Sequence, residues 1–422
     1  MMATANDTEI KYDILCDANN LIDAFRSCKK GSIWKCSVQR YEMNYLRNVN
    51  QQVKAMQEHN YTQQPFNEFT LSERGKTREI KAIHIEDRVI LRNLCDNILT
   101  PSMRKYFIYD NGASLEGKGI KFTRDRLVTH LHKYYREHQS NDGYILMIDF
   151  TKFFDNVQHD KLIEEYDKRI DDKEIMDFIK KIIHCFEIDV SYMDDNEYKY
   201  CLDSIFNAIE YSRIDKSLLT GEKFMKKSIG IGSQISQISG LLYPTRIDNY
   251  CKIVNGLKYY GRYMDDTYII HESKEYLQQL LKEIEAICSE YGIHINMKKT
   301  QIVKLSKTFP FLKNRYTLTA SGKVIQRPNK KCFTRERRKL KKFRKLLDEG
   351  KMTFRDIDNQ YGSWRGTIEK IASYHSLKNM DMLYAELFST EKEYKRYGKY
   401  KQKSRIRTGN QKPRISAVKR GF

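Results

Sequence analysis

The sequence predicts an α+β fold that is rich in helix. Several long segments repeat apolar residues at three-to-four spacing, as the buried face of a helix requires, and several short apolar runs are typical of strands. The chain has 422 residues, of which only six are proline and 40% are hydrophobic. This composition indicates an ordered globule with room for two or three domains.

The first 60 residues are predicted to be helical. Leu21, Ile22 and Phe25 recur at helical spacing, and so do the apolar residues of 41–49. A β-hairpin is predicted next, with strands near 69–71 and 80–83 and a turn at 74–76. A helix should then run from Glu86 to Leu99, with Pro101 just beyond its end.

The run Tyr144–Ile148 follows Gly143 and predicts a buried strand that ends at Asp149. Residues 186–227 are polar and read as an insertion. The remaining elements are predicted by the same patterns: helices from His159, at 241–254 and at 275–291, strands at 259–263, 267–271, 293–295 and 301–303, and a basic helical region from 329 to 384.

The net charge of +21 favours nucleic acid as a partner, because a polyanion is attracted to so basic a chain. A basic protein of the membrane surface is the competing interpretation, but no lipid-anchor signal or long apolar span accompanies the charge. The nine cysteines are scattered without metal-site spacing, which predicts free thiols and a cytoplasmic location. Residues 391–422 carry 12 Lys/Arg against 2 Asp/Glu, and we expect this tail to order on a polyanion.

The letters YMDD occur twice, at 192–195 and at 263–266. In the second copy, Asp265 and Asp266 lie on the turn between two predicted strands, and Asp149 ends a third. Three carboxylates on rigid strands suit a two-metal site for phosphoryl transfer. In the first copy, Asp194 and Asp195 stand in a polar segment without a following strand, so we expect a solvated decoy loop with no catalytic role.

Five motifs in succession, ILMIDFTKFFD, IGIGSQISQ, YYGRYMDDTYII, INMKKTQIV and FPFL, resemble the palm motifs of reverse transcriptases in order and spacing. The resemblance covers about residues 40–385 and implies a right-hand polymerase fold, with an antiparallel palm sheet and a helical thumb. The implied domains are a helical N-terminal region 1–60, fingers 61–145, a palm 146–316 that includes the insertion, a thumb 317–388 and a basic tail 389–422.

The resemblance also implies the chemistry. Asp149, Asp265 and Asp266 would hold two Mg²⁺ ions, with Mn²⁺ as an alternative, since hard cations prefer carboxylate oxygens. Lys299 matches the lysine near the departing pyrophosphate, where an ammonium can stabilise charge or donate a proton. Lys298 is the fallback for that role.

Residues implied in dNTP binding are Arg78, Lys76, Phe150, Phe154 and Gln237. Phe154 matches the aromatic residue that excludes a 2′-hydroxyl, and Arg78 matches the basic residue that grips the triphosphate. The S-Q form of GSQISQ resembles diversity-generating retroelement enzymes and the unknown-group and abortive-infection reverse transcriptases of bacteria. Gln237 is therefore our candidate for an unusual template or fidelity role.

The residues implied in template and primer binding lie in the palm turn, the primer-grip hairpin and the first thumb helix: Gly232, Ser236, Tyr263, Met264, Phe311, Leu312, Arg337, Arg338 and Lys341. Two departures from the family pattern stand out. Lys313 replaces a glycine after the primer grip, and Leu115 replaces a common arginine in SLEGKG, where Lys118 is a candidate substitute.

The expected function is copying of a dedicated noncoding RNA into cDNA by a bacterial or phage retroelement enzyme, for antiphage defence or for mutagenic retrohoming. Expected partners are the RNA template, the cDNA, dNTPs and an accessory protein or a second copy, without a membrane. An RNA-dependent RNA polymerase and a non-catalytic RNA-binding scaffold remain the alternatives. Phe154 argues against the first, and the intact aspartates argue against the second.

Overall fold

The computed structural model describes residues 11–73, 76–211 and 214–388, so the tail 389–422 lies outside the described residues. The chain divides into two units. The first holds residues 1–307 and 320–323, and the second holds 308–319 and 324–422. The predicted domain boundaries are not tested by this division and stay predictions. Among the described helices, none is both long and apolar enough to cross a bilayer.

The N-terminal region is helical, as predicted. It contains η1 (Tyr12–Cys16), α1 (Ala18–Lys29), α2 (Cys36–Met43) and α3 (Tyr45–Gln57). These helices and α4 (Ile85–Leu94) share one apolar core with the rest of the unit. The predicted hairpin is also confirmed, as β1 (Asn67–Glu73) and β2 (Lys76–Ala82), which pair antiparallel.

The helix predicted to stop before Pro101 continues through it, so that prediction was wrong. α4 (Ile85–Leu94) passes into a π-helical turn, η2 (Cys95–Leu99), and then into α5 (Thr100–Arg104). Pro101 stands in the first turn of α5, where a missing N–H leaves no hydrogen bond unmade. The wider π turn therefore lets the chain keep its helical course.

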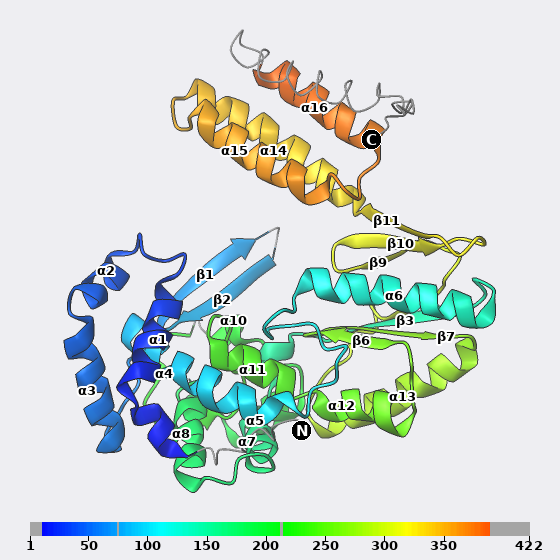
Figure 1. The fold of residues 1–422 in the computed structure, drawn as a ribbon. Helices are drawn as coiled ribbons and strands as arrows, with labels where there is room; N and C mark the ends of the chain where they lie inside the picture. The colour runs from blue at the N-terminus through cyan, green and yellow to red at the C-terminus, as the bar shows by residue number, and fades with distance from the viewer. Residues whose placement is uncertain (1–10, 74–75, 212–213, 389–422) are drawn as a thin grey trace, which may run out of the picture. The chain divides into compact units, whose positions relative to one another are not determined.

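A four-stranded antiparallel sheet organises the first unit (Figure 1). Its order is β6 (Tyr260–Tyr263), β7 (Asp266–His271), β3 (Tyr144–Asp149) and β8 (Gln301–Lys304). α6 (Ile120–His138) covers one face, and α12 (Thr245–Asn249) and α13 (Lys274–Glu290) lie on the other. The segment 293–295 was predicted as a strand, but only one isolated bridge, Phe150 to Ile295, forms there.

Several helices connect the sheet strands. α7 (His159–Asp167) and α8 (Lys173–His184) follow β3, and α11 (Gln234–Leu242) leads to α12 and η5 (Tyr250–Val254). The helix predicted at 241–254 therefore begins earlier and is divided at Pro244. Ser233 caps α11, because its hydroxyl accepts a hydrogen bond from the backbone N–H of Ser236 at 3.0 Å.

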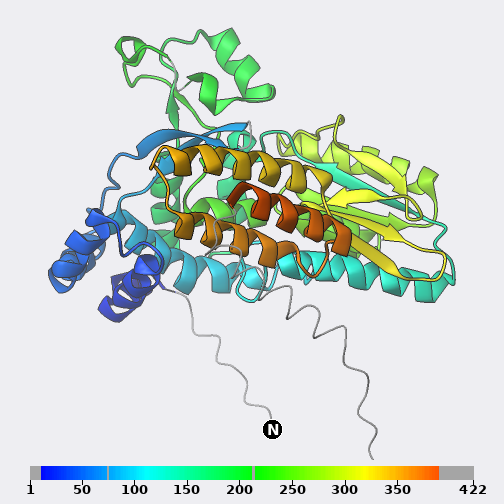
Figure 2. The same cartoon turned by 90° about the horizontal axis from the view of Figure 1, so that it is seen from above.

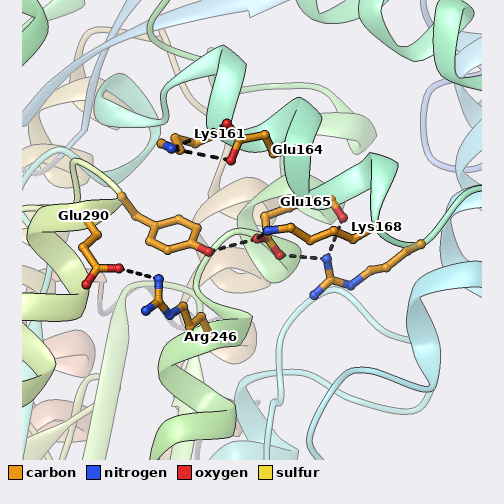
Figure 3. Close-up of polar contacts among 8 residues, drawn as sticks. Lys161, Glu164, Glu165, Lys168, Arg246 and Glu290 are labelled. Atoms are coloured by element: carbon orange, nitrogen blue, oxygen red, sulfur yellow. Dashed lines mark hydrogen bonds and ion pairs between the residues drawn. The ribbon is translucent and has the colours of Figure 1, made fainter.

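A buried carboxylate fixes the end of α13 (Figure 3). Glu165 of α7 accepts hydrogen bonds from Tyr291 at 2.9 Å, Lys168 at 2.6 Å and Arg169 at 2.7 Å. Arg246 pairs with Glu290 beside them. Burial alone would raise the pKa of Glu165, but these donors hold that pKa below its usual value. The anchor matters because the chain after Tyr291 leads to Lys299.

The insertion 186–227 is more than a polar loop. It contains β4 (Ile188–Asp189), α9 (Asp195–Asp203), α10 (Ala208–Tyr211), η4 (Lys216–Leu218) and β5 (Phe224–Met225). It stands away from the central sheet (Figure 2). Its own apolar cluster includes Val190, Met193, Phe206 and Met225. The insertion is therefore a small folded unit built on the β4–β5 pair.

The second unit begins with the sheet β11–β10–β9, made of β9 (Phe309–Phe311), β10 (Asn314–Leu318) and β11 (Val324–Pro328). Three helices follow: α14 (Lys330–Asp348), α15 (Phe354–Ile368) and α16 (Tyr374–Phe388). They pack around a separate core that includes Leu340, Phe343, Tyr361 and Tyr384. The predicted basic helical region is thus a three-helix domain.

Candidate active site and nucleic-acid interface

The sheet brings the three predicted aspartates together. Asp149, the last residue of β3, is the register partner of Asp266, the first residue of β7. Asp265 precedes Asp266 on the tight β6–β7 turn, where Met264 has a φ of 52°. Burial and then the negative charges of Asp266 and Asp265 raise the pKa of Tyr263. The carboxylates, the turn and Tyr263 thus form one site at the end of the sheet.

Lys299 reaches the same site. Its Nζ donates to both oxygens of Asp149, at 2.9 and 2.6 Å. The backbone holds it there, since Asn296 N–H donates to Asp149 O at 2.7 Å and Lys299 N–H donates to Asn296 O at 3.0 Å. Lys298, the fallback, makes no such contact among the described residues. The motif lysine is therefore fixed on the first aspartate.

The residues fit a divalent cation by type and by backbone placement. Carboxylate oxygens are the ligands that Mg²⁺ prefers, and the Asp149 carboxylate already attracts a positive group. As the side chains stand, no group of three or more His, Cys, Asp or Glu residues within the described ranges is arranged to hold a metal ion. Lys299 occupies both oxygens of Asp149, so a cation bound there would displace this ion pair.

Sequence reasoning missed Arg262, which supports the β6–β7 turn. Its side chain is 0% exposed and forms an ion pair with Asp248, which is also 0% exposed. Nε and one terminal nitrogen donate to Asp248 at 2.8 and 2.7 Å. The same terminal nitrogen also donates to Leu241 O at 2.9 Å, and the other terminal nitrogen donates to Gly240 O at 3.4 Å and Met264 O at 3.2 Å.

All five N–H donors of a guanidinium can be used in this set of contacts. Arg262 therefore ties the turn at Met264 to the end of α11 and to Asp248 of α12. The signal available in the sequence was a single cation inside an apolar strand, immediately before YMDD, which is costly to bury without partners.

Two predicted dNTP residues meet at α11. Phe154 lies against Gly240, where an added Cβ would come within 3.1 Å of the Phe154 ring. Gln237 lies one turn before Gly240 on the same helix face, and Ser114 Oγ donates to its side-chain oxygen at 3.1 Å. Phe150 is only 3% exposed and packs in the core, so a direct contact of its ring with a nucleotide is not supported.

The loop before α11 requires glycine at position 232 and places the Ser236 side chain in the interior. Gly232 has a φ of 130°, and an added Cβ would lie 3.2 Å from the Lys81 carbonyl oxygen, so the loop needs glycine to approach β2. Ser236 is 2% exposed, and its hydroxyl donates to Ile229 O at 2.5 Å. Ser236 therefore stabilises the loop, and the predicted template contact by its side chain is not supported.

The hairpin presents Arg78 on β2, exposed and opposite Leu71. Lys76 begins β2, but its side chain lies outside the described residues. Lys81 is buried, with its ammonium 5.6 Å from the centre of the Phe66 ring. Lys118 donates to the carbonyls of Tyr109 and Asn111 at 2.7 and 2.9 Å, so its ammonium ties the SLEGKG segment to residues 109–111.

The first YMDD begins a helix rather than forming a loop. The Asp194 side chain accepts a hydrogen bond from the Glu197 N–H at 2.8 Å and so caps α9. Asp195, whose side chain is 99% exposed, pairs with Lys223 at 2.7 Å. The predicted loop was wrong, but both aspartates have local structural partners in the insertion.

The remaining predicted residues lie in the second unit. Phe311 ends β9 and is buried, and Leu312 and Lys313 form the β9–β10 turn with φ values of 43° and 69°. The turn departs from the family's glycine pattern, as the sequence implied. On α14, Arg337, Arg338 and Lys341 are exposed, while Leu340 and Phe343 are buried in the helical core. These three cations therefore lie outside the helical core, on the exposed side of α14.

The structure resembles solved telomerases, though weakly. Telomerase from Candida albicans in complex with a TWJ fragment of telomeric RNA has 13% identity and a TM-score of 0.42, covering 78% of this chain and 60% of that one. Apo telomerase from Candida tropicalis has 16% identity and a TM-score of 0.38, covering 76% and 63%. The chain thus spans under two thirds of either relative's length. No curated protein matches.

The family model described as "Reverse transcriptase (RNA-dependent DNA polymerase)" matches residues 63–314. That range contains β3, the β6–β7 turn and Lys299, and it is more than half of the chain. The protein belongs to the reverse transcriptase family, with the fold of a right-hand polymerase.

Proposed function

We propose that this protein is an RNA-directed DNA polymerase. The reaction is attack of a primer 3′-hydroxyl, or of a protein or RNA hydroxyl acting as primer, on the α-phosphate of a dNTP, with release of pyrophosphate. The observation that carries the proposal is the register of Asp149 with Asp266 across β3 and β7, with Asp265 beside them. Family membership supports the same reaction.

Asp149, Asp265 and Asp266 would hold two divalent cations, Mg²⁺ or Mn²⁺. Such ions supply charge stabilisation for the attacking and leaving oxygens. The chain itself positions the carboxylates. Each aspartate lies on a hydrogen-bonded strand or on the turn between two strands, and Arg262 fixes this turn by donating a hydrogen bond to Met264 O. Fixed geometry of this kind removes much of the entropic barrier to the reaction.

Lys299 would act at the leaving group. Its ammonium is paired with Asp149, and its side chain is long enough to turn toward a nearby anion. Once Asp149 is engaged elsewhere, the ammonium can stabilise or protonate the departing pyrophosphate. Arg78 would bind the triphosphate, since a guanidinium offers paired donors to phosphate oxygens.

Phe154 would select deoxynucleotides. Its ring is held against Gly240 and is partly buried, which gives it little freedom to yield to a 2′-hydroxyl. Gln237 lies beside it and would contact the template or the incoming base. These roles favour DNA synthesis over the alternative of RNA synthesis.

For the biological setting, we infer a dedicated RNA template and a bacterial or phage retroelement, serving defence or mutagenic retrohoming. The S-Q form of GSQISQ supports this subgroup. The folded insertion 186–227 is the element we assign to an accessory protein or a second copy. All nine cysteines are free thiols, which supports a cytoplasmic location.

The test is primer extension by the full chain on an RNA template with Mg²⁺. We expect DNA synthesis from dNTPs, loss of synthesis on chelation, and loss in Asp149→Asn. RNA synthesis from rNTPs would identify an RNA polymerase instead. RNA binding without synthesis, on this template and on RNA that co-purifies from the native host, would identify a scaffold.

A further inference from the structure

A basic cavity of about 700 Å³ lies between α6, η5 and the start of β6. Five cations line it: Arg126, Lys133, Arg136, Lys252 and Lys258. Two carboxylates, Asp110 and Glu137, also line it, so positive charge is in excess. Nothing in the reaction proposed above uses these residues.

The carboxylates hold only some of the cations. Asp110 pairs with Arg126 at 2.5 Å and with Lys252 at 3.1 Å. Glu137 pairs with Lys258 at 2.5 Å. Within the described part of the chain, the side chains of Lys133 and Arg136 form no ion pair or hydrogen bond, and both are exposed at the rim. The Lys133 and Arg136 side chains are therefore available to bind an anionic ligand.

The framework around them is rigid. Arg262 N–H donates to Asp110 O at 3.1 Å and Gly112 N–H donates to Arg262 O at 2.9 Å, so this segment extends the sheet at the β6 edge. Arg126 donates to His130, which hydrogen-bonds Tyr268 at 2.9 Å. These contacts fix Arg126 and the segment at Asp110 in the cavity wall, whereas the Lys133 and Arg136 side chains have no such contact in the described structure.

The cavity is separate from the catalytic turn. It opens at Tyr259, at the opposite end of β6 from Tyr263. Four residues of extended strand, roughly 13 Å at ~3.3 Å per residue, separate the two positions. Among the residues that the structure describes, none assigned to the nucleotide site lines the cavity, although Asp110 in its wall is hydrogen-bonded through the backbone to Arg262.

We propose that this cavity binds the phosphates of a single-stranded RNA segment outside the active site. Charged side chains dominate its lining, whereas sites for small molecules are mostly apolar. Tyr109, which is 66% exposed, lies beside it with the Arg126 guanidinium 5.0 Å from its ring centre. Cations next to an exposed aromatic ring are typical of surfaces on which single strands bind and stack.

The first experiment uses the full chain and a labelled oligouridine RNA. Lys133→Ala/Arg136→Ala breaks no ion pair within the described structure, so we expect unchanged thermal stability. Binding should weaken, and the slope of log affinity against log salt should fall by about 1.4, since each phosphate contact to a single strand contributes about 0.7. The matched control is Lys274→Ala/Lys282→Ala on α13, on the other face of the sheet, with the same loss of charge and no expected change.

An unchanged slope in the cavity variant, or an equal fall in the control, would overturn the proposal. A second readout needs no variant. RNA should protect Lys133 of the wild type from acylation, measured by mass spectrometry, more than it protects Lys274 and Lys282. Protection by inorganic tripolyphosphate but not by RNA would assign the cavity to a small polyphosphate and also overturn the proposal. Neither assay contains dNTPs or metal, so both remain informative if primer extension fails.

Discussion

Both carboxylate oxygens of Asp149 accept hydrogen bonds from the Lys299 ammonium, at 2.9 and 2.6 Å. The two residues are 150 positions apart in the sequence. The cation that we assign to the leaving group thus pairs with a carboxylate that we assign to metal binding. Metal binding and the position of Lys299 are expected to be coupled.

Lys299→Ala separates the action of Lys299 at the leaving group from its competition with metal for Asp149. The maximal rate should fall about 100-fold or more, because a positioned acid or cation at the leaving group typically contributes that much. The Mg²⁺ concentration at half-maximal rate should also fall, by up to about fivefold, since a half-exposed ion pair contributes at most ~1 kcal/mol. Steady-state extension over a Mg²⁺ titration measures both. Lys298→Ala is the matched control and should change neither; a Lys299→Ala enzyme that needs more Mg²⁺ would contradict the coupling.

Arg262→Lys tests the support beneath the catalytic turn. A lysine keeps the charge but has three donors in place of five, so contacts to Asp248, Leu241 or Met264 must be lost. We expect a lower melting temperature and, well below it, a reduced kcat with little change in the KM for dNTP. A kcat equal to that of the wild type under those conditions would limit Arg262 to a structural role.

Phe154→Ala tests sugar selection. Removal of the ring opens the space next to Gly240, so the preference for dNTP over rNTP should fall about tenfold or more. Single-nucleotide incorporation of dNTP and rNTP on one RNA template measures the ratio of kcat/KM. Phe178→Ala is the control, because that ring is 6% exposed and belongs to the core beside Tyr12 and Tyr61. It should reduce stability and leave the ratio unchanged.

Stability should fall in mild acid because of His130. Burial and the positive charges of Arg126, Lys252 and Lys133 together lower its pKa to about 4, against the opposing effect of Asp110. The unfolded chain, with a His pKa near 6.5, therefore binds a proton that the folded chain does not, and the free energy of unfolding decreases as the pH falls from about 6.5 to 4.

The size of this effect is roughly 3 kcal/mol for a shift of that range. Urea unfolding at a series of pH values measures it. His130→Gln should flatten this part of the profile, whereas His132→Gln, an exposed position on the same helix, should not. An identical profile for wild type and His130→Gln would show that other groups cause the acid sensitivity.

The elements that the sequence predicted well are those set by local patterns. The hairpin at 67–82, the strand ending at Asp149 and the two strands around the second YMDD follow from alternation and apolar runs. Because these strands pair in one sheet, the aspartates could be placed together before any coordinates were known. The two copies of YMDD differ only in what surrounds them, and only the second lies between two strands of the central sheet in the described structure.

The elements that the sequence did not predict depend on distant partners. Apart from Met264, the side-chain partners of Arg262 are 14 to 22 positions away, and no local pattern indicates such contacts. Ser236 fits a binding motif, yet tertiary packing turns its hydroxyl toward Ile229. Pro101 was taken to end a helix, but a π turn before it absorbs the change. The cavity beside α6 joins residues from three separate segments.

The most direct test of the account compares the two YMDD copies in one primer-extension assay with Mg²⁺ and dNTPs. Asp265→Ala/Asp266→Ala removes carboxylates at the end of the sheet, and Asp194→Ala/Asp195→Ala removes a helix cap and a surface ion pair in the insertion. The account predicts that the first variant makes no DNA and that the second retains synthesis, with a loss of stability of about 1 kcal/mol. Synthesis by the Asp265→Ala/Asp266→Ala variant at the wild-type rate would contradict the assignment of the active site.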